Sequence, residues 1–201
     1  MNERWHEPML ASKTQEEPTD DDGRIYEPKL DGNRVIVVKT EERTRLYSRT
    51  GNQLLGQDMI PLVTQAAELL GGHTGVVDGE LVAVVEGQHS HNLVKAKKFR
   101  KKLAIFVFDM TMLDGQPLFN ETWQQRHEIM SGVLVPQTRI IECPYDYDGK
   151  AMMAGAREQG FEGIVSKRTQ SRYRPGHRGT DWLNYKFPEY RAVTSQDVGK
   201  R

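Results

Sequence analysis

The chain has 201 residues, enough for one large domain or two small ones. It carries 28 lysines and arginines against 28 aspartates and glutamates, and this zero net charge excludes a histone-like polycation. A hydrophobic content of 37% is typical of a globular protein and too high for wholesale disorder. No apolar run approaches the length of a membrane span, and the first residues lack the apolar stretch of a signal peptide. The single cysteine, Cys143, excludes an internal disulfide, and together these features favour a cytoplasmic protein.

Charge is distributed unevenly along the chain, and its distribution suggests three segments. Residues 1–22 hold seven acidic residues against two basic ones, and we expect an extended acidic lead-in there. Residues 23–190 are expected to form the folded domain, with 191–201 as a C-terminal tail. Within the domain, residues 95–102 carry six cations in eight positions, and residues 167–178 carry five lysines and arginines, one histidine and no acid.

The predicted elements mix strands and helices in chain order. Hydrophobic patterning and turn residues first predict three strands, at 24–30, 33–39 and 44–48. A helix at 58–70 follows, with Pro61 in its first turn and Gly71-Gly72 at its end. The remaining elements are strands at 75–86 (broken at Asp78-Gly79) and 103–110, a helix at 122–131, a strand at 139–142, a helix at 149–159, and strands at 163–167 and 182–187. Hairpin-linked strands with few βαβ alternations favour antiparallel sheets with flanking helices, class α+β.

The strongest local signal for chemistry lies in the turn between the first two strands, residues 27–34 (Glu27-Pro-Lys-Leu-Asp-Gly-Asn-Arg34). One interpretation is a charged hairpin in which Asp31-Gly32 supplies the turn. The other is catalytic, because a lysine held rigidly beside other cations can lose its proton and attack phosphorus or carbon.

The sequence resembles the covalent nucleotidyltransferases, the superfamily of ATP-dependent DNA ligases, RNA ligases and mRNA capping enzymes. Residues 29–34 resemble motif I of this family, and further motifs follow in the family's order across about four-fifths of the chain. They are residues 48–51 for motif Ia, 78–81 for motif III, 106–109 with 113–115 for motif IIIa, 162–167 for motif IV and 178–186 for motif V. The forms of motifs III and IIIa look most like ATP-dependent DNA ligases, particularly the bacterial end-joining type.

The resemblance implies a fold of two antiparallel sheets with flanking helices around an ATP cleft, and it implies a role for each matching residue. Lys29 would attack the α-phosphate of ATP, expel pyrophosphate and keep AMP as a phosphoramidate. The enzyme would then pass AMP to the 5′-phosphate of nicked double-stranded DNA and seal the nick, using ATP with Mg²⁺ or Mn²⁺. The other implied nucleotide contacts are Glu27 with the adenine amino group, Arg34 and Arg49 with ribose and phosphate, Glu80 with a ribose hydroxyl, Phe108 stacked on adenine, and Lys167, Arg178 and Lys186 around the phosphates. Glu162 would help to hold the metal.

Each implied role has a structural alternative. Phe108, on a buried strand, can offer an apolar face to a purine or simply fill the core. Lys167 and Lys186 can surround a phosphate with positive charge or be solvated charges at a strand edge. Glu162 can be an oxygen ligand for Mg²⁺ or an ordinary residue of a helix-to-strand turn.

Two departures from the family pattern affect the functional prediction. Motif V of DNA ligases usually has lysine two residues before its last lysine, and here that position is Asn184, which can donate a hydrogen bond but supplies no charge. The family also continues into an OB-fold with a basic motif VI, and no partial OB-fold can be read in residues 187–201. The chain is therefore either one domain of a larger protein or a minimal ligase-like protein that works alone or with a partner.

Three functional hypotheses follow. The first is the adenylation domain of an ATP-dependent DNA ligase, with a separate DNA-binding or end-joining protein as a candidate partner. The second is an RNA ligase or capping-like enzyme, against which motif IIIa argues. The third is a nucleotide- or DNA-binding module that has lost turnover, which Asn184 and the absence of a readable OB-fold motivate. The basic cluster at 95–102 is either a solvated helix face or a contact for a phosphate backbone, which would add affinity without sequence preference.

Overall fold

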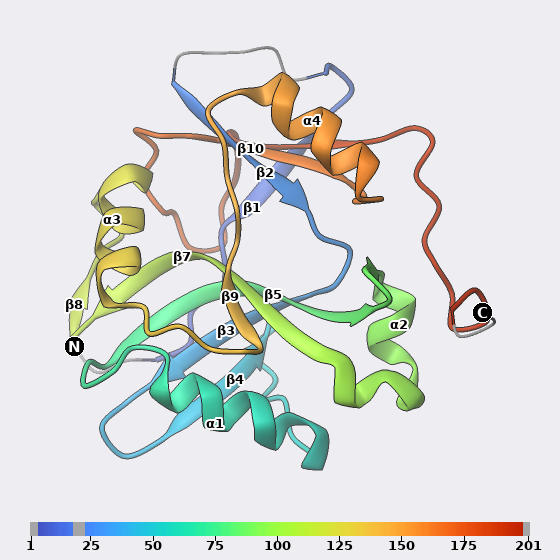
Figure 1. The fold of residues 1–201 in the computed structure, drawn as a ribbon. Coiled ribbons are helices and arrows are strands. Elements are labelled where there is room, and N and C mark those ends of the chain that lie inside the picture. The colour runs from blue at the N-terminus through green and yellow to red at the C-terminus, as the bar shows by residue number, and fades with distance from the viewer. Residues whose placement is uncertain (1–3, 18–22, 199–201) are drawn as a thin grey trace.

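A computed structural model of the chain describes residues 4–17 and 23–198. The last residues of the expected acidic lead-in (18–22) and of the expected tail (199–201) lie outside the described residues, as do residues 1–3. Two sheets face each other, and the helices lie on their outer sides and ends (Figure 1). The expected α+β class with two sheets and flanking helices is confirmed.

The first sheet has four strands, and α4 (Gly149–Glu158) covers its outer face. In sheet order the strands are β1 (Leu10–Thr14), β11 (Arg178–Lys186), β10 (Gly163–Arg168) and β2 (Arg24–Lys29). A small apolar cluster, which includes Tyr26, Met153 and Phe187, lies between this sheet and α4. The β1 strand comes from the expected lead-in and pairs parallel with β11, whereas the sequence led us to expect only antiparallel pairs.

The second sheet is larger, and its central strands carry most of the apolar core. Its main path is β4 (Thr44–Ser48), β3 (Asn33–Lys39), β5 (Gly75–Val85), β7 (Leu103–Leu113) and β8 (Gln116–Pro117), with β6 (Gln88–His89) paired to β5 and β9 (Ile140–Glu142) paired to β7. The β7–β9 pair is parallel because a crossover through α3 (Trp123–Val133) joins the two strands. The expected break at Asp78-Gly79 is a register shift within a continuous β5.

The helices begin and end where their local sequence dictates. Pro61 lies in the first turn of α1 (Ile60–Glu68), which follows a short 3₁₀ helix (Gln57–Met59), as the sequence predicted. Thr122 caps α3 with a capping box that includes Gln125. The basic cluster lies on α2 (His91–Lys95) and a 3₁₀ helix (Lys97–Lys102), so it does not form one long helix. No helix within residues 4–17 and 23–198 is long and apolar enough to cross a membrane.

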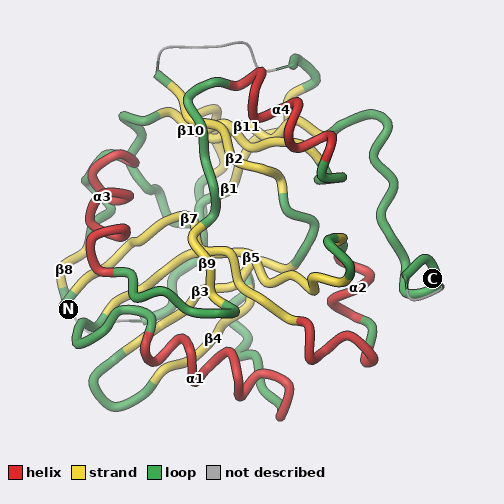
Figure 2. The backbone as a smooth tube through the Cα atoms, in the orientation of Figure 1, coloured by secondary structure: helices red, strands yellow, loops and turns green. Residues whose placement is uncertain are grey.

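The turn between β2 and β3 crosses from one sheet to the other (Figure 2). Gly32 lies in this turn, and a Cβ atom there would come within 2.3 Å of the Leu81 carbonyl oxygen on β5. The motif therefore requires glycine at this position because the turn backbone packs directly on the second sheet. Lys29, the last residue of β2, consequently stands at the junction of the two sheets.

Candidate nucleotide-binding site

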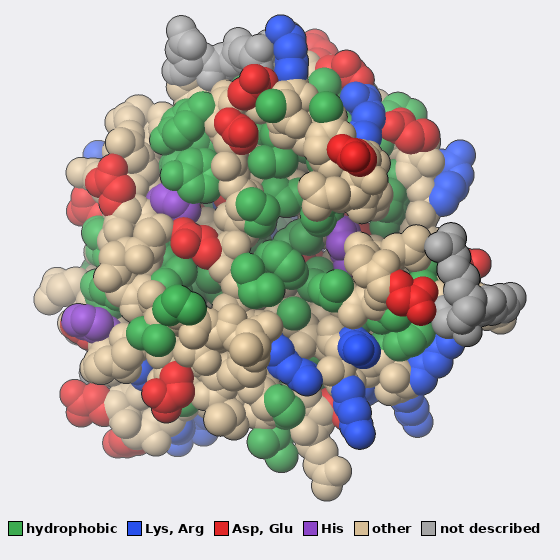
Figure 3. Space-filling model, viewed as in Figure 1, with side chains coloured by type: hydrophobic (Ala, Val, Ile, Leu, Met, Phe, Trp, Pro, Cys, Tyr) green, Lys and Arg blue, Asp and Glu red, His purple; other side chains and the backbone are tan. Residues whose placement is uncertain are grey.

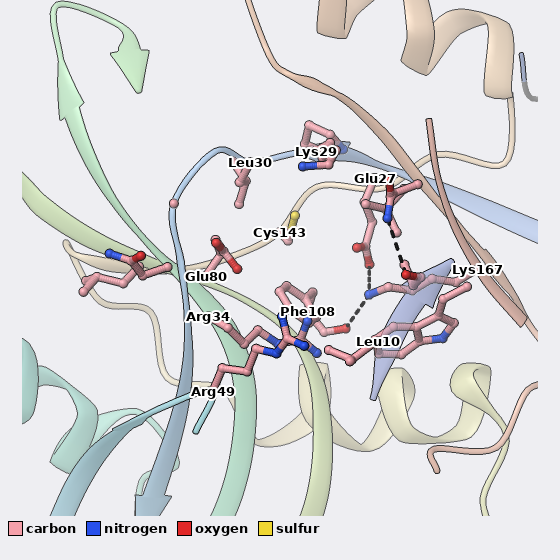
Figure 4. A pocket seen from close by; sticks show the side chains of 18 of the residues that line it. Leu10, Glu27, Lys29, Leu30, Arg34, Arg49, Glu80, Phe108, Cys143 and Lys167 are labelled. Atoms are coloured by element: carbon pink, nitrogen blue, oxygen red, sulfur yellow. Dashed lines mark hydrogen bonds and ion pairs between the residues drawn. The ribbon is translucent and has the colours of Figure 1, made fainter. Parts of the chain in front are cut away.

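A cavity of about 550 Å³ opens between the two sheets, a volume typical of small-molecule sites. Eight of the ten residues singled out from the sequence line it: Glu27, Lys29, Arg34, Arg49, Glu80, Phe108, Lys167 and Arg178. The close view in Figure 4 labels all of these except Arg178 and shows their side chains coming from both sheets. The other two, Glu162 and Lys186, join the site because Glu162 pairs with both Lys29 and Lys186.

Lys29 lies in a row of three residues across the first sheet. Gly163 on β10 is the register partner of Lys29 on one side and of Lys186 on the other. Because Gly163 has no side chain, Glu162 reaches both lysines: one of its carboxylate oxygens pairs with Lys29, and the other lies 3.1 Å from the Lys186 Nζ atom. The lysine in motif I is thus held as an ion pair at the edge of the cavity.

A second lysine–glutamate pair is fully buried deeper in the site. The Lys167 Nζ atom lies 2.7 Å from a carboxylate oxygen of Glu27, and the two side chains are 1% and 5% exposed. The same ammonium lies 4.3 Å from the centroid of the Phe108 ring and 4.5 Å from that of Trp182, within cation–π range. Burial raises the pKa of Glu27, and the charge of Lys167 opposes this rise. The Lys167 ammonium is thus held in place by one carboxylate and two aromatic rings.

Arg34 is tethered within the second sheet. Its Nε and Nη2 atoms each lie 2.5 Å from an oxygen of the buried Asp78, and Nη2 also donates to the Met9 carbonyl at 3.0 Å. Tyr173 donates its hydroxyl to the same Asp78 at 2.6 Å. The guanidinium carbon lies 4.7 Å from the Phe108 ring centroid. Arg34 therefore lines the cavity and also packs against the ring of Phe108.

Glu80 differs from the other cavity glutamates because the described residues provide it with no hydrogen bond or ion pair. It lies directly opposite Arg34 in the β3–β5 register. Burial raises its pKa to about 7, although the charges of Arg34 and Lys29 act in the opposite direction. A carboxyl group with free oxygens at the cavity wall can accept a hydrogen bond from a ligand hydroxyl.

An aromatic wall and a cationic rim complete the cavity. Phe108 is only partly buried, which favours the interpretation that it faces a ligand over that of a core residue. The exposed Arg49 and Arg178 lie at the rim, where Arg178 donates to the Ala11 carbonyl on β1. Asn184, also at the cavity, donates to the same carbonyl at 3.5 Å. Both motif V side chains thus hold β1 in place.

A divalent metal fits this site only if the phosphates of the nucleotide also coordinate it. No group of three or more histidine, cysteine, aspartate or glutamate residues within the described parts of the chain could hold a metal. Glu162 and Glu80 can each offer a carboxylate, and Mg²⁺ is commonly bound by one or two carboxylates together with substrate phosphates. The donor set therefore agrees with a metal that arrives with ATP.

The sequence did not single out several residues that the structure places in the site. Asp78 and Trp182 lie within the recognised motifs, so their positions were known and their contacts were not. Cys143 lines the cavity from the segment after β9, and burial raises the pKa of its thiol well above the usual value. No pattern in the sequence points to Cys143 or to the pairing of β1 with β11, because both depend on tertiary packing.

Two facing sheets with a lysine at their junction, an aromatic wall and a rim of cations define a nucleotidyltransferase domain. The comparisons with known proteins specify the family. The model of the ATP dependent DNA ligase domain matches residues 8–186. The chain belongs to this family, as the sequence motifs predicted.

Curated relatives and solved structures agree with this assignment. The multifunctional non-homologous end joining protein LigD of Mycolicibacterium smegmatis is 30% identical over 90% of this chain and 24% of its own length. The DNA ligase of Thermococcus onnurineus is 31% identical over 80% of this chain and 32% of its own. The crystal structure of the ligase domain of M. tuberculosis LigD matches with a TM-score of 0.76 at 26% identity, over 90% of this chain and 59% of that one. A mycobacterial DNA ligase D complexed with ATP and MES matches with a TM-score of 0.74 at 25% identity, over 90% of this chain and 60% of that one. The chain thus spans about a quarter to a third of these two curated relatives.

Proposed function

We propose that the domain catalyses the nucleotidyl-transfer steps of an ATP-dependent DNA ligase. The unprotonated Lys29 attacks the α-phosphorus of ATP, a P–N bond forms, and the P–O bond to pyrophosphate breaks. AMP then passes from Lys29 to the 5′-phosphate at a nick, breaking the P–N bond. Finally the 3′-hydroxyl attacks that phosphate, joins the strand and releases AMP.

The observation that carries this proposal is the position of Lys29 at the edge of a cavity that already contains an aromatic wall and several cations. Adenine would stack on Phe108, and Glu27 with its neighbouring backbone would read the amino group. Glu80 would accept a hydrogen bond from a ribose hydroxyl. Arg178 and Lys186, with Arg34 and Arg49, would supply positive charge where the phosphates lie, and the buried Lys167 would place a fixed positive charge beside Phe108 and Glu27.

The metal has a limited part in this proposal. Glu162 would hold Mg²⁺ or Mn²⁺ together with the phosphates, and the ion would neutralise part of their charge. For Lys29 to act, its ammonium must lose a proton and separate from Glu162, so the ion pair describes a resting state. Glu162 would therefore pair with Lys29 in the resting state and would help to hold the metal once Lys29 has moved toward the phosphate.

We also propose that the basic cluster at 95–102 contacts the DNA backbone. Residues 87–108 contain six lysines and arginines and no acid, which leaves 22 basic against 28 acidic residues in the rest of the chain. All five lysines of the cluster are exposed, and blue side chains gather around α2 at the lower right of Figure 3. Among the six cations of this cluster, Arg100 alone forms an ion pair within the described residues. Its Nη1 atom lies 3.1 Å from a carboxylate oxygen of Asp58. Such unpaired charge suits a phosphate backbone.

This basic surface contacts the turn that follows the nucleophile. The His91 Nδ1 atom on α2 lies 3.2 Å from the Gly32 carbonyl oxygen in the motif I turn.

Replacing Lys97, Lys101 and Lys102 with Gln should weaken binding of a nicked duplex. The slope of log affinity against log salt should fall by about 0.9 for each phosphate that the variant no longer neutralises. Arg43→Gln, an exposed cation in the turn between β3 and β4, is the control and should leave the slope unchanged.

The cellular location and the partner protein are proposed as the sequence predicted them. We propose that the domain acts in the cytoplasm, where ATP and reduced thiols are available, and that a separate DNA-binding or end-joining protein assists it. The similarity to LigD proteins supports a role in DNA repair by end joining. An RNA ligase or capping-like activity is the alternative, and nucleotide and strand preference distinguish it from the DNA ligase.

The test is labelling and sealing with matched substrates. The protein is incubated with Mg²⁺ and α-labelled ATP or GTP and run on a denaturing gel, and nicked DNA and RNA duplexes are then added. The proposal expects covalent labelling by ATP and sealing of the DNA nick. Phe108→Ala should weaken ATP use by about 1–3 kcal/mol because the base–aromatic stack is removed. Equal labelling by GTP would favour the capping-like alternative.

A further inference from the structure

The last described residues fold back across the molecule and connect its two sheets. Residues 187–198, here called the C-terminal strap, leave β11 beside α4 and run to the segment that carries α2 (Figure 1). The Ser90 hydroxyl donates to the Val193 carbonyl, and the Lys98 Nζ atom donates to the Ser195 carbonyl at 2.6 Å. Val193 and Val198 pack against the main apolar cluster of the second sheet. The strap is thus anchored on both sheets.

One strap side chain reaches the motif I turn. The hydroxyl of Tyr190 donates a hydrogen bond of 3.0 Å to Asp31 Oδ2. Burial raises the pKa of this phenol and the charge of Asp31 raises it further, so the hydroxyl remains a donor at neutral pH. Asp31 follows Lys29 by two residues, in the turn that crosses between the sheets. The bond therefore ties together two separate crossings between the sheets.

The contacts of Tyr190 close a ring around the nucleophile. The Lys186 Nζ atom lies 5.1 Å from the centroid of the Tyr190 ring. Lys186 pairs with Glu162, and Glu162 pairs with Lys29. From Lys29 the backbone leads through the turn to Asp31, and the hydrogen bond returns to Tyr190. Tyr190 itself does not line the nucleotide cavity.

We propose that Tyr190 is a positioning residue for Lys29, an inference that rests on the proposed function. When Lys29 separates from Glu162 to reach the α-phosphorus, its side chain moves and the ion pair between them breaks. The Tyr190–Asp31 bond then keeps the backbone of the turn in place while the side chain swings. A nucleophile misplaced by about 1 Å can lose two orders of magnitude in rate, so this restraint acts on the chemical step.

Tyr190→Phe tests the proposal because it removes the hydroxyl and keeps the ring under Lys186. In single-turnover reactions the maximal rate of Lys29 adenylation should fall about tenfold, the effect expected for removing one hydrogen bond to a charged group. The ATP concentration for half-maximal rate should change less than about twofold, since Tyr190 does not line the cavity. Sealing of a pre-adenylated nick, which needs no attack by Lys29, should be unchanged. Tyr147→Phe, at an exposed tyrosine outside the cavity, is the control and should leave all three values unchanged.

A second readout is independent of activity. In the ATP-free protein, Tyr190→Phe should increase amide hydrogen exchange of residues 30–33 without increasing it in β5. An equal adenylation rate in wild type and variant, or unchanged exchange in the turn, would overturn the proposal. If sealing of the pre-adenylated nick falls as much as adenylation, Tyr190 acts on the whole domain and the proposal is also wrong. A wild-type protein that forms no adenylate contradicts the proposed function instead, and the exchange measurement then decides on Tyr190 alone.

Discussion

Two lysine–glutamate ion pairs lie at the cavity, and they differ in how far their side chains are exposed to solvent. Lys29 and Glu162 have side chains 23% and 12% exposed, whereas Lys167 and Glu27 have side chains 1% and 5% exposed. The ammonium of Lys167 is enclosed by a carboxylate and two aromatic rings. The ammonium of Lys29 stands at the end of a strand, with the open cavity beside it.

The difference in exposure distinguishes Lys29, a lysine that can react, from Lys167, a lysine that provides a fixed charge. A lysine that becomes a nucleophile must leave its carboxylate and lose a proton, which a partly exposed pair at a strand end permits. A buried pair that loses one partner leaves an uncompensated charge in an apolar place, which costs several kcal/mol. The first pair therefore suits catalysis, and the second suits a fixed positive charge beside a bound nucleotide.

The largest effect is expected at the Lys29–Glu162 pair. Lys29→Ala should abolish covalent labelling by ATP while the free energy of unfolding changes by less than about 1 kcal/mol, because Glu162 keeps Lys186 as an ion-pair partner. The measurements are the gel assay and urea unfolding. Undiminished labelling of the variant would show that another residue is the nucleophile.

The buried pair should respond in the opposite way. Lys167→Met should lower the free energy of unfolding by about 3–5 kcal/mol, because Glu27 would remain buried without its partner. Urea unfolding measures this loss directly. The double variant Lys167→Met/Glu27→Gln should recover part of it. A single variant as stable as the wild type would show that the two pairs do not differ as described.

The third expected effect concerns the phosphate end of the cavity. Asn184→Lys restores the charge that the family has at this position and should speed self-adenylation by up to about a hundredfold, the scale of one electrostatic donor. Sealing of a pre-adenylated nick should change less. Single-turnover adenylation compares the two proteins. If Asn184→Lys slows the first step, the site is built around the asparagine, which holds β1 through the Ala11 carbonyl.

The smallest expected effect concerns Glu80, the cavity glutamate that lacks an ion-pair partner among the described residues. Its pKa is raised to about 7 from an ordinary value of 4.5, so the folded state binds its proton more tightly than the unfolded state. Its stabilising contribution is therefore present below about pH 4.5 and lost as the pH rises through about 7. The midpoint of thermal unfolding of Glu80→Gln, relative to wild type, should rise over this range. A constant difference between the two midpoints would contradict the raised pKa.

The sequence predicted the fold class, nearly all the long strands and the family, because these depend on local patterns and ordered motifs. The turn at 29–34 was recognisable since glycine, aspartate and lysine each have a local role there. The parallel pairing of β1 with β11 was not predictable, because the pentapeptide at 10–14 has no alternating pattern and its partner lies at the other end of the chain. The Tyr190–Asp31 bond spans 159 residues and leaves no local signal. The roles of the site residues remain predictions.

The central claim is that Lys29 is the residue that carries AMP. The most direct measurement is peptide mapping by mass spectrometry after incubation of the whole chain with ATP and Mg²⁺. The account predicts one AMP adduct, on the peptide that contains Lys29, and its loss when nicked DNA is added. An adduct on Lys167 or Lys186, or on any other peptide, would contradict the account.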